Sequence, residues 1–228
     1  MRVTAAQKAA TRGRIVRAAH RLFTRHGFAA VTTRDIARAA GIASGTLFNY
    51  FPTKEAVAVA LAASALADAR AGWDAAGGGG RAGSLDEALF ALVAAELRAL
   101  EPHRGYLGPV LETALKALPG PIGDPEGGAI RAGHVDRVRA LLATYRPAAP
   151  AGPVAEHLYW SLYTGVLAFW AADPPPAPDE TLAILDHSVR AFVGWLDAPP
   201  PQPVPESEKA DDADRRGARR PPRPRPGG

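Results

Sequence analysis

Cysteine is absent from this chain of 228 residues. Its absence excludes a disulfide framework, a thiolate metal site and a cysteine nucleophile. No stretch approaches the run of about 18 apolar residues that a membrane span needs, and no signal-peptide core follows Met1. We therefore expect a cytoplasmic protein with no membrane partner. Apolar residues make up 47% of the chain, which is enough for an ordinary globular core.

Acidic residues are scarce at the N-terminus. The formal net charge of +4 conceals ten basic and two acidic residues in 1–55, a balance of +8, against −6 in 56–198 and +2 in 199–228. A basic segment followed by an acidic one is typical of a polyanion-binding region confined to the N-terminus. Most of the basic residues are arginine, however, and GC-rich coding bias produces the same composition without any binding function. Charge alone leaves both interpretations open.

The arrangements that enzymes and metal sites require are also missing. The six histidines show no HxxxH or similar metal-ligand spacing, and no Ser-His-Asp set, phosphate loop or paired carboxylates stand out. His134 and Asp136 are two residues apart and do not share a helix face. We expect no catalytic residue, no metal and no cofactor. An enzyme remains the weaker alternative, and it predicts substrate turnover and indifference to DNA.

Apolar periodicity predicts an all-α fold. Ile15, Ala18, Ala19, Leu22 and Phe23 form one face of a helix that Gly27 ends. Thr32 and Asp35 fit a capping box, and Gly41 ends the short helix that they open. Further helices are predicted near 44–50, 54–73, 85–100, 104–118, 129–146, 153–172 and 179–197, and no alternating run is long enough for a sheet.

A capped short helix, a turn at Gly41 and a second short helix describe a helix-turn-helix over 32–51. The second helix of such a unit enters the major groove of DNA. Ile36, Leu47 and Phe51 are expected to face the core. Gly45 weakens its helix, and its missing side chain is useful where a helix approaches a duplex closely.

Residues 12–57 carry the pattern Arg-x-x-Ile-x-x-Ala-Ala-x-x-Leu-Phe-x-x-x-Gly-Phe-x-x-Val-Thr-Thr-x-x-Ile-Ala-x-x-Ala-Gly-Ile-x-x-Gly-Thr-Leu-Phe-x-Tyr-Phe-x-x-Lys-Glu-x-Val. This pattern resembles the DNA-binding domain of the TetR family of transcriptional regulators. The resemblance implies a three-helix helix-turn-helix domain, which we place at 9–69, followed by a helical ligand-binding and dimerisation domain at 70–198. Beyond about 50 residues the chain is similar to the family only in length and helical pattern.

Carried over by position, the resemblance implies contacts with double-stranded operator DNA. It assigns phosphate contacts to Thr32, Thr33, Tyr50 and Lys54, and base-edge or groove contacts to Ser44, Gly45, Thr46, Phe48 and Asn49, and we add Arg34. A lysine at a helix start opposes the helix dipole, so Lys54 is easier to explain if it serves a phosphate; a solvated lysine is the alternative. Two departures put the operator sequence in doubt. Ala43 stands where the family usually has a capping serine, which leaves Ser44 as a substitute cap, and Phe48 stands where it often has tyrosine.

The resemblance also implies a homodimer and a small-molecule effector. The stripe Leu182, Leu185, Val189, Phe192, Val193 and Leu196 is a candidate dimer interface. The helix at 153–172 is apolar on most sides, so it must be buried by the core together with a partner, or by a monomeric core alone. Candidate pocket residues are Trp73, Tyr106, Val110, His134, Tyr159 and Tyr163, although each is also a plausible core residue.

The sequence thus predicts a homodimeric repressor that an effector releases from a palindromic operator. Two alternatives stay open: an activator, and a protein that keeps the TetR fold to bind a lipid or other small molecule without specific DNA binding. Residues 199–228 contain nine prolines and mixed charge, which predicts a disordered tail. Contact between its Arg-Pro end and DNA phosphates is the alternative for this segment.

Overall fold

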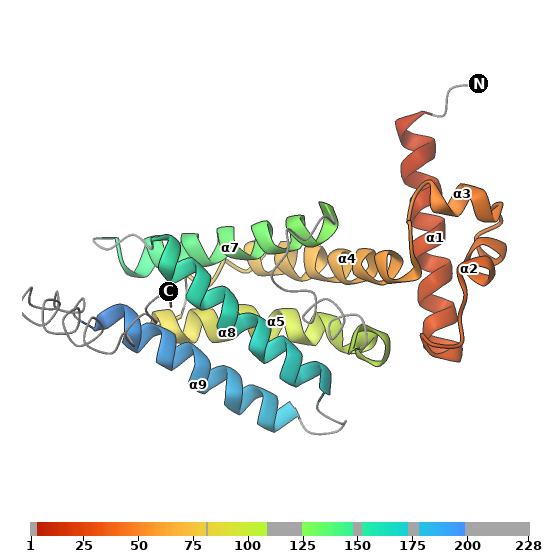
Figure 1. Cartoon of the computed structure of the whole chain (residues 1–228). Helices are drawn as coiled ribbons and strands as arrows, with labels where there is room; N and C mark the ends of the chain where they lie inside the picture. Colours follow the sequence, from red (N-terminus) through yellow and green to blue (C-terminus); the bar gives the residue numbers. More distant parts are fainter. Residues whose placement is uncertain (1–3, 81, 109–124, 148–151, 173–177, 199–228) are drawn as a thin grey trace, which may run out of the picture. The chain divides into compact units, whose positions relative to one another are not determined.

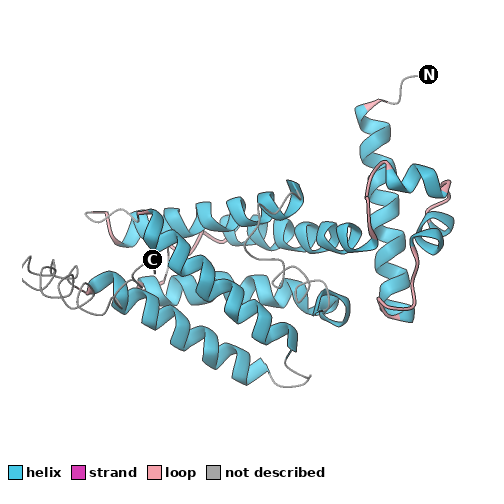
Figure 2. Ribbon diagram, viewed as in Figure 1, coloured by secondary structure: helices cyan, strands magenta, loops and turns pink. Residues whose placement is uncertain are grey.

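The computed structural model describes residues 4–80, 82–108, 125–147, 152–172 and 178–198. Its elements are α1 (Ala5–His26), α2 (Thr33–Ala39), α3 (Ser44–Phe48), α4 (Lys54–Ala75), α5 (Leu85–Leu100), the 3-10 turn η1 (Glu101–His103), α7 (Pro125–Tyr145), α8 (Pro153–Ala172) and α9 (Pro178–Asp197) (Figure 1). Residues 104–108 are helical as well. No strand occurs among these residues, which confirms the all-α prediction (Figure 2).

The first three helices pack around one apolar centre. Ile15 of α1, Ile36 of α2, Leu47 of α3 and the adjacent Phe51 are buried, as the sequence predicts. Gly27 ends α1 with φ of 77°, a conformation that favours glycine. Helix α1 begins earlier than the apolar stripe indicates. Thr4 and Gln7 form a capping box at its start, a signal that is present in the sequence as Thr-x-x-Gln.

Helix α4 joins the N-terminal helices to the remainder of the chain. Thr53 caps it, and it packs against α1, α5 and α7. Lys54–Ala75 is long and apolar enough to cross a membrane by length and composition, so the expectation that no such stretch exists was wrong. The helix carries the buried Arg70 and contacts three other helices, which makes it a core helix of this fold.

Helices α5, α7, α8 and α9 form the second group of elements, which we call the body (Figure 1). Ser84 caps α5, and Glu87 Oε2 accepts a hydrogen bond from the backbone of Gly83, one residue before the cap. The turn at 77–80 follows α4, as the run of glycines predicts. Tyr145 of α7 donates its hydroxyl to the carbonyls of Gly79 and Ala82 and so fixes this turn.

Several sequence predictions are not tested by the described residues. Residues 1–196 form one compact unit, and α4 crosses the proposed domain boundary at 69/70 without a break, so that boundary stays a prediction. Val110, most of the helix expected at 104–118 and the tail at 199–228 lie outside the described residues.

Candidate functional site

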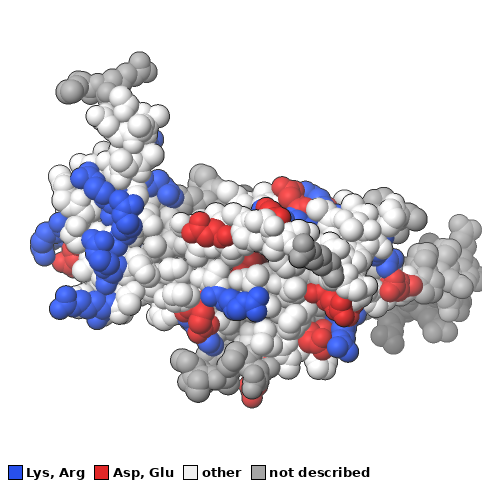
Figure 3. Space-filling view, turned by 180° about the vertical axis from the view of Figure 1, so that it is seen from behind, with Lys and Arg blue, Asp and Glu red and all other residues white. Residues whose placement is uncertain are grey.

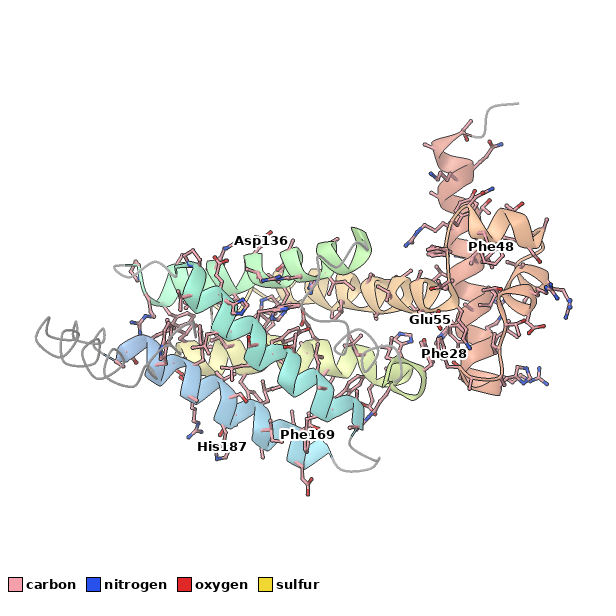
Figure 4. All side chains as sticks on the ribbon, viewed as in Figure 1. Phe28, Phe48, Glu55, Asp136, Phe169 and His187 are labelled. Atoms are coloured by element: carbon pink, nitrogen blue, oxygen red, sulfur yellow. The ribbon has the colours of Figure 1, made fainter. Side chains whose placement is uncertain are left out.

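Helix α3 presents an exposed polar and aromatic surface above a buried base. Leu47 is buried, whereas Phe48 is 52% exposed and Asn49 is exposed (Figure 4). The helix ends at Phe48, two residues before the predicted end, so Asn49 and Tyr50 lie in the turn that follows it. Phe48 is a large apolar side chain left exposed, and a groove carrying thymine methyl groups is a surface that such a side chain can contact.

Gly45 has open space where a side chain would be. A Cβ atom built at this position meets nothing within 4 Å, so packing inside the chain does not require glycine here. Ala43 is the N-cap of α3 and supplies no side-chain hydrogen bond, whereas Ser44 lies within the helix. Ser44 therefore does not replace the missing cap, and its exposed hydroxyl stays available for other contacts.

The start of α2 is fixed by a reciprocal pair. Thr32 Oγ1 lies 2.6 Å from Asp35 Oδ2 and accepts a hydrogen bond from the backbone of Asp35, while the Thr32 backbone donates to the same carboxylate. These hydrogen bonds from Thr32 hold the pKa of Asp35 below its ordinary value. The Thr32 hydroxyl is thus committed to the cap, while Arg34 is exposed and Thr33 half-buried.

Lys54 lies at the start of α4 and is bound to the loop that precedes α2. Its Nζ is 2.9 Å from the carbonyl oxygen of Phe28, 3.3 Å from that of Val31 and 3.5 Å from that of Ala29. The ammonium also lies 4.3 Å from the centre of the Phe28 ring. This cation therefore has a structural partner on the protein, which accounts for a lysine at a helix start without invoking a phosphate.

Basic side chains dominate the surface of the N-terminal helices. In Figure 3, Lys and Arg gather over this part with little acidic surface among them, whereas both signs are mixed over the body. Arg14, Arg17, Arg21, Arg25 and Arg34 are all exposed. A surface of this kind attracts a polyanion and makes binding salt-dependent.

A second polar cluster is buried in the body. Arg70 of α4 donates from Nε to Glu96 Oε1 of α5 at 2.9 Å, and from a terminal nitrogen to the carbonyl of Ile130 at 3.1 Å. Tyr163 of α8 donates its hydroxyl to Glu96 Oε2 at 2.8 Å. His134 of α7 places Nδ1 2.9 Å from the same oxygen, off the direction of a ring N–H, so this contact is not a well-aligned hydrogen bond. We call these residues, together with Tyr159, the buried polar cluster.

The residues around Glu96 stabilise its ionised carboxylate. Burial by itself raises the pKa of Glu96, but His134, Arg70 and the Tyr163 hydroxyl outweigh it and bring the pKa to about 2. Burial and the charge of Glu96 raise the pKa values of Tyr159 and Tyr163, so both hydroxyls keep their protons. The ring of His134 stacks on that of Tyr163, with centroids 3.9 Å apart. Four helices thus meet at one carboxylate.

An apolar slot adjoins this cluster. It lies between α5, α8 and α9, has a volume of about 10 Å³ and is lined by Val93, Tyr159, Leu162, Tyr163, Val166, Leu185, Ser188, Val189 and Phe192. A space of this size holds at most one water molecule. Among the described residues, no group of three or more His, Asp or Glu side chains is placed to hold a metal ion.

The comparisons with known proteins agree with this geometry. A family model described as "Bacterial regulatory proteins, tetR family" matches residues 15–61, which include α2 and α3. The structure of Thermus thermophilus FadR, a TetR-family transcriptional repressor in complex with lauroyl-CoA, has a TM-score of 0.63 with 26% identity, over 85% of this chain and 99% of that one. Residues 15–61 belong to the TetR family of bacterial regulatory proteins.

Two further relatives differ in how far the likeness reaches. A TetR transcriptional regulator from Rhodococcus sp. RHA1 has a TM-score of 0.64 at 20% identity and covers 82% of this chain and 97% of its own. A proposed mycofactocin biosynthesis transcriptional regulator of Mycobacterium tuberculosis, MftR, is 58% identical over 36 residues. The match spans 18% of the length of that curated relative, so the likeness is confined to a short segment.

The structure separates the pocket residues that the sequence grouped together. His134, Tyr159 and Tyr163 meet in the buried polar cluster. Tyr106 lies elsewhere, against His20 of α1, and Trp73 packs beside the glycine turn. Arg70 and Glu96 were missed. A signal for Glu96 exists in the sequence, because it occupies a helical stripe position among Leu92, Val93 and Leu100.

The predicted dimer stripe lies on a face that the chain's own core covers in large part. Leu185, Val189 and Phe192 of α9 are buried in the regulator's own core, and Leu182 and Leu196 are half-buried against it. These side chains form the inner face of α9 because α5 and α8 lie against them. The exposed large apolar side chains of the described body are instead Val154 of α8, at 69%, and Trp195 of α9, at 44%.

Proposed function

We propose that the regulator is a homodimeric repressor that binds a palindromic operator and releases it when a small-molecule effector binds the body. The observation that carries this proposal is the exposed surface of α3, where Phe48 and Asn49 lie above a buried Leu47 with open space at Gly45. A rigid base with exposed groove-reading side chains is what a recognition helix needs. A cytoplasmic location follows from access to chromosomal DNA.

The DNA contacts divide by chemistry. We propose that Ser44, Gly45, Thr46, Phe48 and Asn49 read the groove and that Thr33, Arg34 and Tyr50 hold phosphates. Thr32 acts through the position of α2, because its hydroxyl is committed to the cap. In a dimer, the two recognition helices meet successive turns of the major groove, about 34–36 Å apart.

The proposed dimer uses the outer face of α8 and α9. These helices run antiparallel, so Val154 near the start of α8 and Trp195 near the end of α9 lie at the same end of the pair (Figure 1). Ser161 and Gly165 are exposed along α8, where small side chains permit close approach of a second helix. A second copy would cover this face by two-fold symmetry.

The proposed effector has an apolar part and a polar end. Thermus thermophilus FadR binds lauroyl-CoA, and its likeness to this chain supports an effector site in the body. The buried polar cluster offers hydrogen-bonding groups beside an apolar slot, and the slot must widen to admit a ligand. Release of DNA then requires that the effector bind the widened form more tightly than the closed one.

The test is selection of genomic fragments by the purified full-length protein, followed by sequencing. Recovery of one short palindrome supports the specific repressor, and Asn49→Ala or Thr46→Ala should then change the preferred bases. Random fragments without a common motif would overturn specific DNA binding and favour a small-molecule binder with a TetR fold. An operator whose occupancy raises transcription in a reporter would instead indicate an activator.

A further inference from the structure

One tyrosine hydroxyl bridges two imidazoles between α1 and the segment that follows α5. Tyr106 Oη lies 3.0 Å from Nδ1 of His20 on α1 and is also hydrogen-bonded to Nδ1 of His103 in η1. The two imidazole ring centres are 5.0 Å apart. The ring of Tyr106 is buried and lies 5.2 Å from that of Phe23 on α1. The cluster therefore connects the first helix of the DNA-binding domain to the body.

The number of protons decides whether this bridge can form. A tyrosine hydroxyl has one proton, so it donates to one Nδ1 and accepts from the other. Two neutral rings satisfy this arrangement with opposite tautomers, and one protonated ring satisfies it as well. When both rings are protonated, both Nδ1 atoms are donors, the hydroxyl proton loses its acceptor and two cations face each other. The bridge thus accepts one added proton and excludes a second.

The charged neighbours reinforce this limit. The adjacent cleft, about 370 Å³ in volume, is lined by Arg17 and Arg21 of α1 and Asp68 of α4 together with both histidines. On the segment of Tyr106 itself, Arg104 pairs with Glu101. Two arginines against one aspartate in the cleft leave an excess of positive charge. Burial lowers the pKa of His103 and the charge of His20 lowers it further, while burial raises the pKa of Tyr106 so that its hydroxyl stays protonated.

We propose that His20, Tyr106 and His103 form a proton-operated joint that holds α1 against the body when at most one imidazole is charged and lets it go when both are. The opened joint takes up a proton that the closed joint excludes. The closed form is therefore favoured at a pH above the ordinary histidine pKa of about 6.5. Below that pH, the ratio of the closed to the open form falls by up to about tenfold per pH unit.

Hydrogen exchange of the full-length protein at pH 7.5 and 5.5, corrected for intrinsic rates, tests the joint. We expect amides of residues 20–26 and 103–108 to lose protection at pH 5.5. His103→Gln keeps hydrogen-bonding groups and cannot titrate, so its protection should not change between these values. His187→Gln is the matched control, because His187 is exposed on α9 and bonds within its own helix (Figure 4). Equal pH dependence in the wild-type protein and His103→Gln would overturn the proposal.

Nitrogen NMR of the wild-type imidazoles gives a second, independent measurement of the joint. His20 and His103 should protonate in two coupled steps, with the second at least one pH unit below the first. The imidazole resonances are assigned with variants in which each of the other histidines is changed to glutamine in turn. Two independent titrations near pH 6.5 would contradict the bridge.

The consequence for DNA rests on the proposed function and is measured separately. The probe is a duplex that the protein selects from a randomised pool at pH 7.5. Between pH 7.5 and 5.5 at constant salt, wild-type affinity should fall about tenfold more than that of His103→Gln, because α1 loses its fixed position. An equal fall would overturn the coupling to DNA. Failure to select any duplex would overturn the proposed function, while the exchange experiment would still decide the joint.

Discussion

Arg70 and Glu96 form a buried ion pair, with Arg70 Nε 2.9 Å from Glu96 Oε1, that joins the helix leaving the DNA-binding domain to the body. The pair is one part of a cluster that also includes His134, Tyr159 and Tyr163. Because both charged groups are desolvated, neither can lose its partner without leaving an uncompensated charge inside the protein. The buried polar cluster therefore lies at the point where α4 is attached to the body.

Removal of the carboxylate should therefore destabilise the fold strongly. Glu96→Ala leaves Arg70 buried without its partner, and we expect a loss of about 3–5 kcal/mol in the free energy of unfolding by urea. The matched control is Glu156→Ala, which breaks the more exposed pair with Arg139 and should cost about 1 kcal/mol or less. Similar losses in the two variants would show that the buried cluster contributes no special stability.

The same carboxylate predicts how stability depends on acid. The pKa of Glu96 is lowered to about 2 in the folded protein, so the folded state binds fewer protons than the unfolded state between pH 4.5 and 2. Its contribution, about 3 kcal/mol, is complete above pH 4.5 and is lost as the pH falls through this window. Glu96→Gln should flatten the pH dependence of unfolding there. An unchanged slope in this variant would assign the acid sensitivity to other groups.

Local features of the sequence predicted local structure well. The Thr32–Asp35 capping box and the glycine end of α1 each depend on residues that lie within a few positions of one another. The buried faces of Ile36 and Leu47 follow from helical periodicity for the same reason. Interactions between residues a few positions apart can be predicted from the spacing of residue types along the chain.

Interactions over longer separations could not be predicted in this way. Glu96 meets Arg70 across 26 residues and Tyr163 across 67, and no single-chain spacing relates them. The stripe on α9 shows that one face is apolar, but it does not say whether the chain's own core or a second copy covers that face. The resemblance assigns Lys54 to a phosphate and its place at a helix start agrees with that, but its partners in the structure are carbonyls 23 to 26 residues away.

Gly45 should separate DNA binding from stability. Gly45→Ala adds a side chain in open space, so the helix should become more stable by about 0.5–1 kcal/mol. Affinity for the selected operator should fall at least about tenfold, because the added methyl group meets the duplex. Gly72→Ala is the control, because Gly72 is an exposed position of α4 whose Cβ also meets nothing, and this change should stabilise the protein without altering DNA affinity. Retained affinity in Gly45→Ala would remove this position from the interface.

Lys54 can be assigned by two independent measurements. Lys54→Met keeps the aliphatic stem and removes the ammonium that binds the carbonyls of Phe28 and Val31. We expect a loss of about 1–2 kcal/mol in stability and an unchanged dependence of DNA affinity on salt. A phosphate contact would instead reduce the salt slope by about 1 with little loss of stability. Arg34→Met serves as the comparison. Arg34 is exposed and is a proposed phosphate contact, so its removal should lower the salt slope of DNA affinity.

Trp195 tests which face of α9 meets a second copy. Trp195→Lys places a charge on the exposed end of the proposed interface, where it must be desolvated in a dimer and remains hydrated in a monomer. We expect light scattering to report a monomer with unchanged helicity by circular dichroism, and weaker binding to a two-half-site operator. Thr144→Lys is the control, because Thr144 is exposed on α7 and bonds only to the carbonyl of Ala140 in its own helix. A Trp195→Lys protein that remains dimeric would move the interface to another surface.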